Sequence, residues 1–119
     1  MIGESTKHMG QRKKLVGILK DKGILDINVL DAISNIPRHL FMDSAFQNHA
    51  YQDKAFPIGE NQTISQPYTV AFQTQELKLK KGMKILEIGT GSGYQLQFYV
   101  KWEQMFLQLK DNISCIENV

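Results

Sequence analysis

The prediction of the fold rests on one segment, Leu86-Glu87-Ile88-Gly89-Thr90-Gly91-Ser92-Gly93-Tyr94. Residues 83–88 are mostly apolar, so they are expected to form a buried strand that leads directly into the glycines. Glycines at alternate positions let the backbone turn sharply and approach a ligand without clashes from Cβ atoms. A strand that runs into such a turn is typical of the first unit of a doubly wound α/β sheet.

The ligand of this turn is indicated by the acidic residue beside it. Glu87 stands two positions before the first glycine, where a carboxylate would repel a pyrophosphate and would suit a cationic group. The spacing G-x-G-x-G also differs from the G-x-G-x-x-G of dinucleotide-binding segments. We therefore expect the turn to bind S-adenosylmethionine through its amino group. A simple tight turn between strand and helix is the alternative.

Helices are expected on the N-terminal side of this unit. Apolar spacing predicts one from residue 12 to 22, stopped by Gly23, and Asp26 is a plausible N-cap for a second that ends at Ile36-Pro37. Residues 38–62 mix aromatic and polar side chains and are predicted to form loops with a short helix around 44–48. A third helix is expected over residues 66–78, with Pro67 in its first turn.

Composition excludes several classes of protein. The chain has 119 residues and a formal net charge of +2, too small to indicate a nucleic-acid partner. Its single cysteine, Cys115, excludes an internal disulfide, and no Cys/His spacing suggests a metal site. The sequence has no apolar run of membrane length and no N-terminal signal region, so we expect a cytoplasmic protein.

Two motifs together resemble one enzyme family, the protein-L-isoaspartate O-methyltransferases. The residues from Glu87 to Tyr94 are similar to motif I of class I methyltransferases. A more specific match precedes it, with the residues Tyr51-Gln52-Asp53, Phe56-Pro57-Ile58-Gly59 and Gln62-Thr63-Ile64-Ser65-Gln66-Pro67-Tyr68. The resemblance spans about residues 12–95. The family often has glycine where Asn61 stands here, and asparagine tolerates the positive φ that a turn there requires.

The resemblance implies an incomplete Rossmann-like class I methyltransferase fold, made of an N-terminal helical cap, the first strand and the glycine loop. It implies that Ser65 is catalytic and hydrogen-bonds the substrate carboxylate. The other implied site residues are Gln62, Thr63 and Ile64 for substrate and Glu87, Gly89, Thr90, Gly91 and Gly93 for the cofactor. The implied reaction methylates the α-carboxylate of isoaspartyl residues in peptides and proteins, the first step of their repair.

Alternatives stay open for single residues. Ser65 could instead cap the helix that starts beside Pro67. Asp53 is at least as plausible a turn residue as a functional acid, and His39 is expected to be structural. Tyr94 could pack in the core or lie next to the cofactor.

The residues after the glycine loop depart from the family. We expect a disordered N-terminus over 1–11, the N-terminal part of a methyltransferase domain over 12–95 and an aberrant tail over 96–119. The bulky side chains Phe98, Trp102 and Phe106 fit a helix by period but are predicted to be too large to pack beside the glycines. Such a tail could also be a partner-binding helix of a non-enzymatic module. A different class I methyltransferase with another small substrate is a further alternative.

Our hypothesis is that the tail is translated out of frame. If the codons are read two bases later from within Leu96, the junction of Trp102 and Glu103 must encode glycine, and that of Met105 and Phe106 must encode valine. With permitted codons elsewhere, the shifted frame can read A-V-L-C-E-M-G-A-N-V-F-T-I-E-R-Q. That series resembles the helix end, turn, strand and ribose-binding acid with which the family continues. The 119-residue form is therefore expected to bind the cofactor weakly or not at all.

Overall fold

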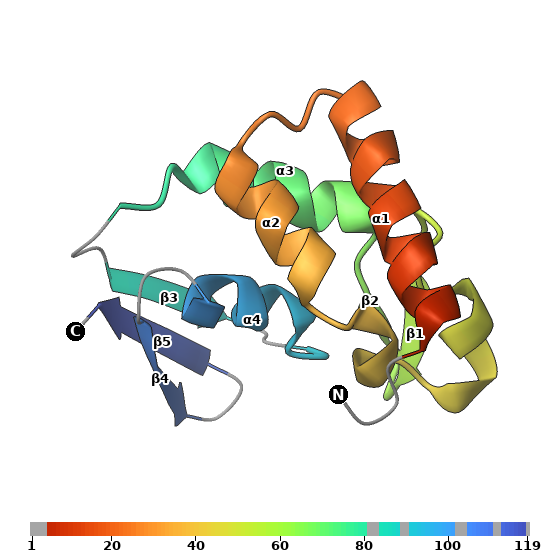
Figure 1. The fold of residues 1–119 in the computed structure, drawn as a ribbon. Helices are drawn as coiled ribbons and strands as arrows, with labels where there is room; N and C mark the ends of the chain where they lie inside the picture. The colour runs from red at the N-terminus through yellow and green to blue at the C-terminus, as the bar shows by residue number, and fades with distance from the viewer. Residues whose placement is uncertain (1–4, 81–83, 89–90, 102–104, 111–112, 119) are drawn as a thin grey trace.

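The computed structural model describes residues 5–80, 84–88, 91–101, 105–110 and 113–118. Its elements in chain order are α1 (Thr6–Asp21), α2 (Ile27–Asn35), the 3-10 helices η1 (Arg38–Phe41) and η2 (Ser44–His49), β1 (Phe56–Gly59), β2 (Gln62–Ile64), α3 (Pro67–Leu77), β3 (Lys84–Ile88), α4 (Tyr94–Lys101), β4 (Met105–Lys110) and β5 (Ile113–Asn118). Figure 1 shows α1, α2 and α3 grouped on one side of the molecule, with β3, β4, β5 and α4 below them.

Helix α1 begins earlier than its apolar spacing predicts. Ser5 is its N-cap, and the Ser5 side chain accepts a hydrogen bond from the His8 backbone N–H at 3.1 Å. This bond satisfies one of the free amides of the first turn and extends the helix beyond its apolar stripe. The expected disorder of residues 1–11 is thus wrong from Thr6 onward. The predicted stop is confirmed, since Gly23 follows the helix with φ of 99°.

The second and third helices confirm their predicted signals. Asp26 caps α2 by accepting from the Asn28 backbone N–H at 2.9 Å, and the helix ends just before Ile36-Pro37. Pro67 opens α3, where its missing N–H costs nothing. Buried side chains of α1, α2 and α3 meet in one core, to which they contribute Leu15, Leu19, Val29, Ile33, Val70 and Ala71 among others.

A β-hairpin replaces the loops predicted between residues 56 and 64. Strand β1 pairs antiparallel with β2, and the register places Phe56 opposite Ile64. The turn between them has positive φ at Gly59, Glu60 and Asn61, of 96°, 52° and 58°. The expectation that Asn61 supports a left-handed turn is confirmed. The strands escaped prediction because each is short and their hydrophobic alternation covers few positions.

The second sheet differs from a doubly wound sheet, because two of its three strands come from the tail after residue 96. Its strand order is β3-β5-β4, and β5 pairs antiparallel with both neighbours, so the described strands make no parallel pair. Strand β3 lies at an edge of this sheet, and Leu86 in its middle is 64% exposed, against the prediction of a buried strand. The structure is therefore a mixed helix and strand fold, compatible with part of a methyltransferase domain.

Helix α4 packs better than its bulky side chains suggested. Leu96 and Phe98 are 4% and 0% exposed, so the prediction that bulky side chains cannot pack beside the glycines is wrong for Phe98. The ring of Phe98 meets that of Tyr94 edge-on, with 5.1 Å between the centroids. Farther along, residues 105–110 form strand β4 and not a continuation of the helix.

Asp53 joins three segments that are distant in the sequence. Its carboxylate accepts from the Tyr68 backbone N–H at 2.8 Å, from the Gln66 side chain at 3.2 Å and from Lys22 at the end of α1. No side chain caps α3 locally, so Asp53 supplies the cap from a distance. Burial alone would raise the pKa of Asp53, but the hydrogen bonds from Lys22, Tyr68 and Gln66 outweigh it and lower the pKa below 3.8.

Replacing this carboxylate is expected to destabilise the protein in a pH-dependent way. In Asp53→Asn the amide turns a donor toward Lys22 and Gln66, so we expect a loss of about 1–2 kcal/mol at pH 7. Because the folded pKa is lowered, the wild-type advantage is present above the ordinary aspartate pKa and disappears as the pH falls through the folded value. Urea unfolding of both proteins at pH 7 and pH 3 measures this.

Asp43→Asn is the matched control. Asp43 caps η2 by accepting from the Ala45 backbone N–H at 3.0 Å on the protein surface, and asparagine caps equally well. We expect no change at either pH. An equal loss in both variants would mean that Asp53 acts only as an ordinary surface cap.

Candidate functional site

The predicted substrate residues lie on the hairpin and the short link to α3. Gln62 and Thr63 are exposed on β2, and Ser65 is exposed in the link. Ile64 differs from them, because its side chain is 2% exposed and belongs to the core. Ile64 can therefore reach a ligand only through its backbone. It anchors the strand that presents its neighbours.

The alternative interpretation of Ser65 as a helix cap is wrong. The N-cap of α3 is Gln66, and the amide in the first turn of the helix is bound by Asp53. Ser65 thus lies one residue before the N-cap Gln66, in front of a helix whose first turn Asp53 holds in place. Its hydroxyl is exposed and is not required to complete the helix.

The glycine turn has the backbone geometry that its sequence indicates. Gly91 and Gly93 have positive φ, of 59° and 84°, which other residues adopt only with strain. A Cβ atom built on either glycine would meet no described atom within 4 Å, so the turn borders open space. Backbone can therefore approach a ligand here. The predicted residues Gly89 and Thr90 and the side chain of Glu87 lie outside the described part of the structure.

Tyr94 follows the glycine turn and points its side chain into the core. Its backbone N–H donates to the Ser92 hydroxyl at 3.2 Å, and α4 begins at this residue. The side chain is 1% exposed and packs edge-on against Phe41 at 5.8 Å between centroids. Of the two roles considered for Tyr94, the structure supports core packing. Burial raises its pKa well above 10, so the phenol stays protonated.

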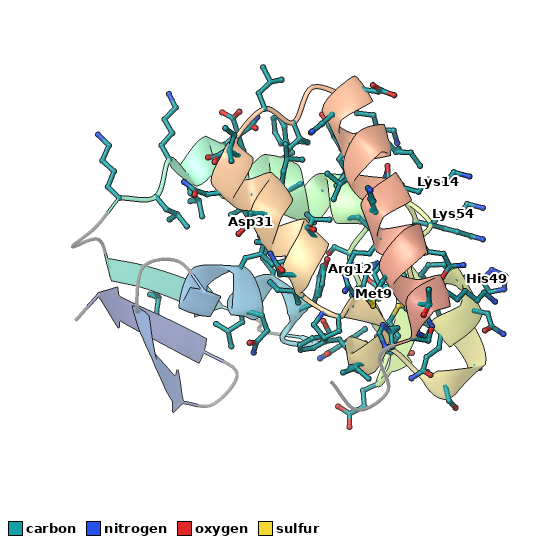
Figure 2. The ribbon with its side chains drawn as sticks, viewed as in Figure 1. Met9, Arg12, Lys14, Asp31, His49 and Lys54 are labelled. Atoms are coloured by element: carbon teal, nitrogen blue, oxygen red, sulfur yellow. The ribbon has the colours of Figure 1, made fainter. Side chains whose placement is uncertain are left out.

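A buried polar cluster fixes α1 to the segment before the hairpin. The Tyr51 hydroxyl lies 3.0 Å from Arg12 Nη1, which donates to it, and 2.7 Å from His39 Nδ1. His8 stacks on the His39 ring with 3.9 Å between centroids. The expectation that His39 is structural is confirmed by this packing. Figure 2 shows Arg12 lying against the body of the protein, whereas Lys14 and Lys54 extend away from it.

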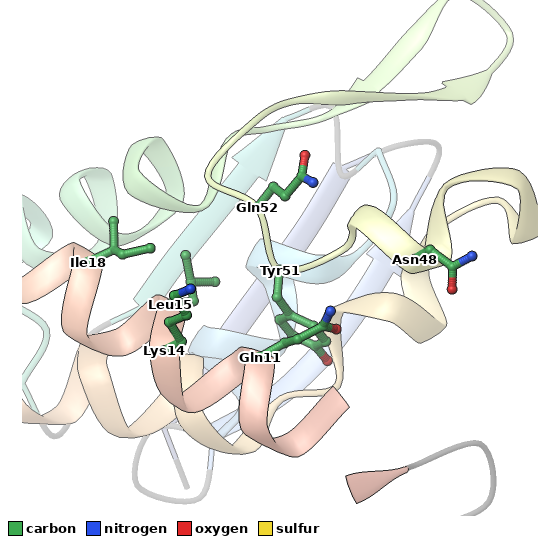
Figure 3. A pocket seen from close by; sticks show the side chains of 7 residues that line it. All are labelled: Gln11, Lys14, Leu15, Ile18, Asn48, Tyr51 and Gln52. Carbon is green, nitrogen blue, oxygen red and sulfur yellow. The ribbon is translucent and has the colours of Figure 1, made fainter. Parts of the chain in front are cut away.

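Two cavities of the described structure lie away from the predicted site residues. One of about 230 Å³ lies between α1 and the segment that carries Tyr51, as Figure 3 shows. A more open one lies between α1 and α2. Neither is lined by Ser65 or the glycines, so these cavities do not join the two predicted halves of the site. In the described ranges no group of three or more metal-ligating side chains occurs, and no helix there is long and apolar enough to cross a membrane.

Two residues that position the site were missed by sequence reasoning. Asp53 holds the start of α3 beside Ser65, and Arg38 is the largest fully buried side chain of the described core. A single sequence gives little signal for either role. A distant cap looks like an ordinary turn residue, and a buried arginine looks like a surface charge until its carbonyl partners are known.

Comparison with known proteins agrees with the two motifs. The family model for protein-L-isoaspartate(D-aspartate) O-methyltransferase matches residues 10–110. A protein-L-isoaspartate O-methyltransferase of Cytophaga hutchinsonii is 68% identical over 114 residues, which cover 96% of this chain and 48% of that protein. Proteins with the same name from Christiangramia forsetii and Flavobacterium johnsoniae are 66% and 67% identical over 92 residues, covering 77% of this chain and 43% of theirs.

The chain thus spans less than half the length of these curated relatives. The family model nevertheless covers most of the chain, from before the middle of α1 to the end of β4. The chain belongs to the protein-L-isoaspartate(D-aspartate) O-methyltransferase family.

Proposed function

We propose that this chain carries the N-terminal part of an enzyme that methylates the α-carboxylate of L-isoaspartyl residues in damaged proteins, with S-adenosylmethionine as methyl donor. The observation that carries the proposal is the exposed Ser65, held two residues before a helix whose first-turn amide is bound by Asp53. Family membership gives the reaction class and the substrate. The complete domain would be a Rossmann-like class I methyltransferase.

The glycine turn is the proposed cofactor side of the site. Its left-handed residues Gly91 and Gly93 border open space, which fits close approach of backbone to a ligand. Gly89, Thr90 and the acidic Glu87 would complete this side, with the carboxylate facing the ligand's amino group. When bound, S-adenosylmethionine supplies a methyl group already activated on a sulfonium.

The substrate side would act by orientation. An isoaspartyl carboxylate is ionised at neutral pH, so it attacks without a general base. Ser65 donates a hydrogen bond to one carboxylate oxygen and leaves the other free to attack. A neutral hydroxyl suits this role because it aligns the nucleophile without neutralising it, as a bidentate arginine would. Gln62 and Thr63, exposed on β2, would bind the peptide on either side.

The proposed role of Ser65 can be tested in a chimera. Residues 1–95 are joined to the remainder of the Cytophaga hutchinsonii relative, which is similar enough for the parts to pack. We expect methylation of an isoaspartyl peptide and none of the matching aspartyl peptide. Ser65→Ala is expected to lower kcat/KM about 10- to 100-fold, the loss of one hydrogen bond to a charged group.

Ser44→Ala serves as the control, because Ser44 is an exposed serine at the start of η2. Its activity should equal that of the unchanged chimera. Methylation of both peptides, or of neither, would contradict the substrate assignment and favour another class I methyltransferase or an interaction module.

The cofactor affinity of the 119-residue form is a separate prediction. The tail forms strands β4 and β5, which pair antiparallel. Its sequence does not follow the family's order of helix end, strand and ribose-binding acid. We expect no S-adenosylmethionine binding in the micromolar range by titration calorimetry. Micromolar affinity would show that the glycine turn binds without the rest of the domain.

The frame-shift explanation of the tail is tested by the coding DNA. The shifted frame must contain glycine across the codons of Trp102 and Glu103 and valine across those of Met105 and Phe106. We expect the remaining codons to extend the resemblance to the family past Leu96. A shifted frame that stops early, or continues without family-like residues, would leave the tail as a genuine feature of this chain.

A further inference from the structure

Arg38 lies in the interior with an unusual set of contacts. The side chain is fully buried, and its Nε and Nη2 atoms donate to the backbone carbonyls of Ala50 and Lys54 at 2.9 and 3.1 Å. Its guanidinium carbon lies 4.9 Å from the centre of the Tyr94 ring. Arg38 thus contacts the turn of residues 50–54 through hydrogen bonds and the start of α4 through an aromatic face.

The turn of residues 50–54 leads to the substrate side of the proposed site. In the sequence, Asp53 stands between Ala50 and Lys54, whose carbonyls Arg38 binds. Its carboxylate accepts hydrogen bonds from the Gln66 side chain and the Tyr68 backbone N–H. Those two residues immediately follow Ser65 and Pro67 in the chain. Any displacement of the turn therefore moves the cap of α3 and with it the link that carries Ser65.

The other contact of Arg38 leads to the cofactor side. Tyr94 follows Gly93 directly in the sequence. The Gly93 carbonyl accepts a hydrogen bond from the Gln97 backbone N–H at 3.2 Å, in the first turn of α4. The Tyr94 ring is held between Phe41 and Phe98 as well as Arg38. The position of this ring therefore determines where the glycine turn sits.

The burial of Arg38 against Tyr94 is not explained by a gain in folding stability. Among the described residues, Arg38 Nη1 and the Tyr94 hydroxyl are buried without a well-formed hydrogen bond, although the two groups attract each other. A buried charge with incomplete hydrogen bonding costs free energy, and an apolar side chain of similar size would fill the space at lower cost. A guanidinium is nevertheless suited to this position, because its N–H groups donate within its plane while its flat face packs against an aromatic ring.

We propose that Arg38 is a positioning residue that fixes the glycine turn relative to the segment carrying Ser65. This deepens the proposed function, because the two ends it joins are the cofactor and substrate sides of that site. Arg38 itself touches no reacting atom in this scheme. Its effect is to make the two sides move as one unit.

Hydrogen exchange measured by mass spectrometry on the 119-residue chain tests the coupling. In Arg38→Lys a single ammonium cannot reach both carbonyls and the ring. We expect exchange to rise about tenfold in residues 50–54 and also in residues 93–97. Thr74→Val is the control, because Thr74 is also buried and its hydroxyl donates to the Val70 carbonyl within α3. It should leave residues 93–97 unchanged.

The same coupling is measured from the opposite end. Tyr94→Leu removes the ring and should raise exchange in residues 50–54 about tenfold, since coupling between two positions is reciprocal. Tyr94→Phe keeps the ring and should exchange like the wild type. If Arg38→Lys does not fold, the comparison of Tyr94→Leu with Tyr94→Phe tests the coupling by itself.

The proposal is overturned if Arg38→Lys opens residues 50–54 alone, or if Tyr94→Leu and Tyr94→Phe exchange alike. The measurement needs neither cofactor nor substrate, so it can fail while the proposed function holds, and it can succeed while the chimera shows no methyl transfer.

Discussion

The Asp53 carboxylate is the point on which the rest of this structure depends. Three donors meet on it: the Tyr68 amide and the Gln66 side chain at the start of α3, and Lys22 at the end of α1. A single acceptor with two oxygens satisfies all three because a carboxylate offers several lone pairs in one plane. The orientation of α3 relative to α1, and the position of Ser65, follow from this one group.

Two buried arginines extend the same principle to the neighbouring elements. Arg12 ties α1 to the end of α2 through the Ser34 carbonyl and to Tyr51, while Arg38 ties η1 to the turn of residues 50–54. Both bind oxygen atoms that are fixed in the fold. Their contribution is therefore geometric, since a planar fork with several donors restrains the distance and the angle between segments.

The sequence was sufficient for features that depend on local chemistry. The Asp26 cap, the stop at Gly23, the Pro67 start and the left-handed Asn61 each follow from what one residue type does at one position. Features set by tertiary contact were not predictable. Whether Leu86 would be covered, whether Phe98 would find space and which residue would cap α3 depend on elements far away in the chain. The two motifs identified the candidate residues, but only the structure distinguished the exposed Ser65 from the buried Ile64.

Most of the core is assembled from residues that precede the glycine turn. Leu15, Leu19, Val29, Ile33 and Val70 come from helices that end before β3 begins, and of the residues whose burial is described only Tyr94, Leu96 and Phe98 join from beyond it. During synthesis the helical portion can therefore bury most of its apolar surface before the cofactor segment has left the ribosome. Nascent chains would then present a largely formed platform onto which the sheet is added.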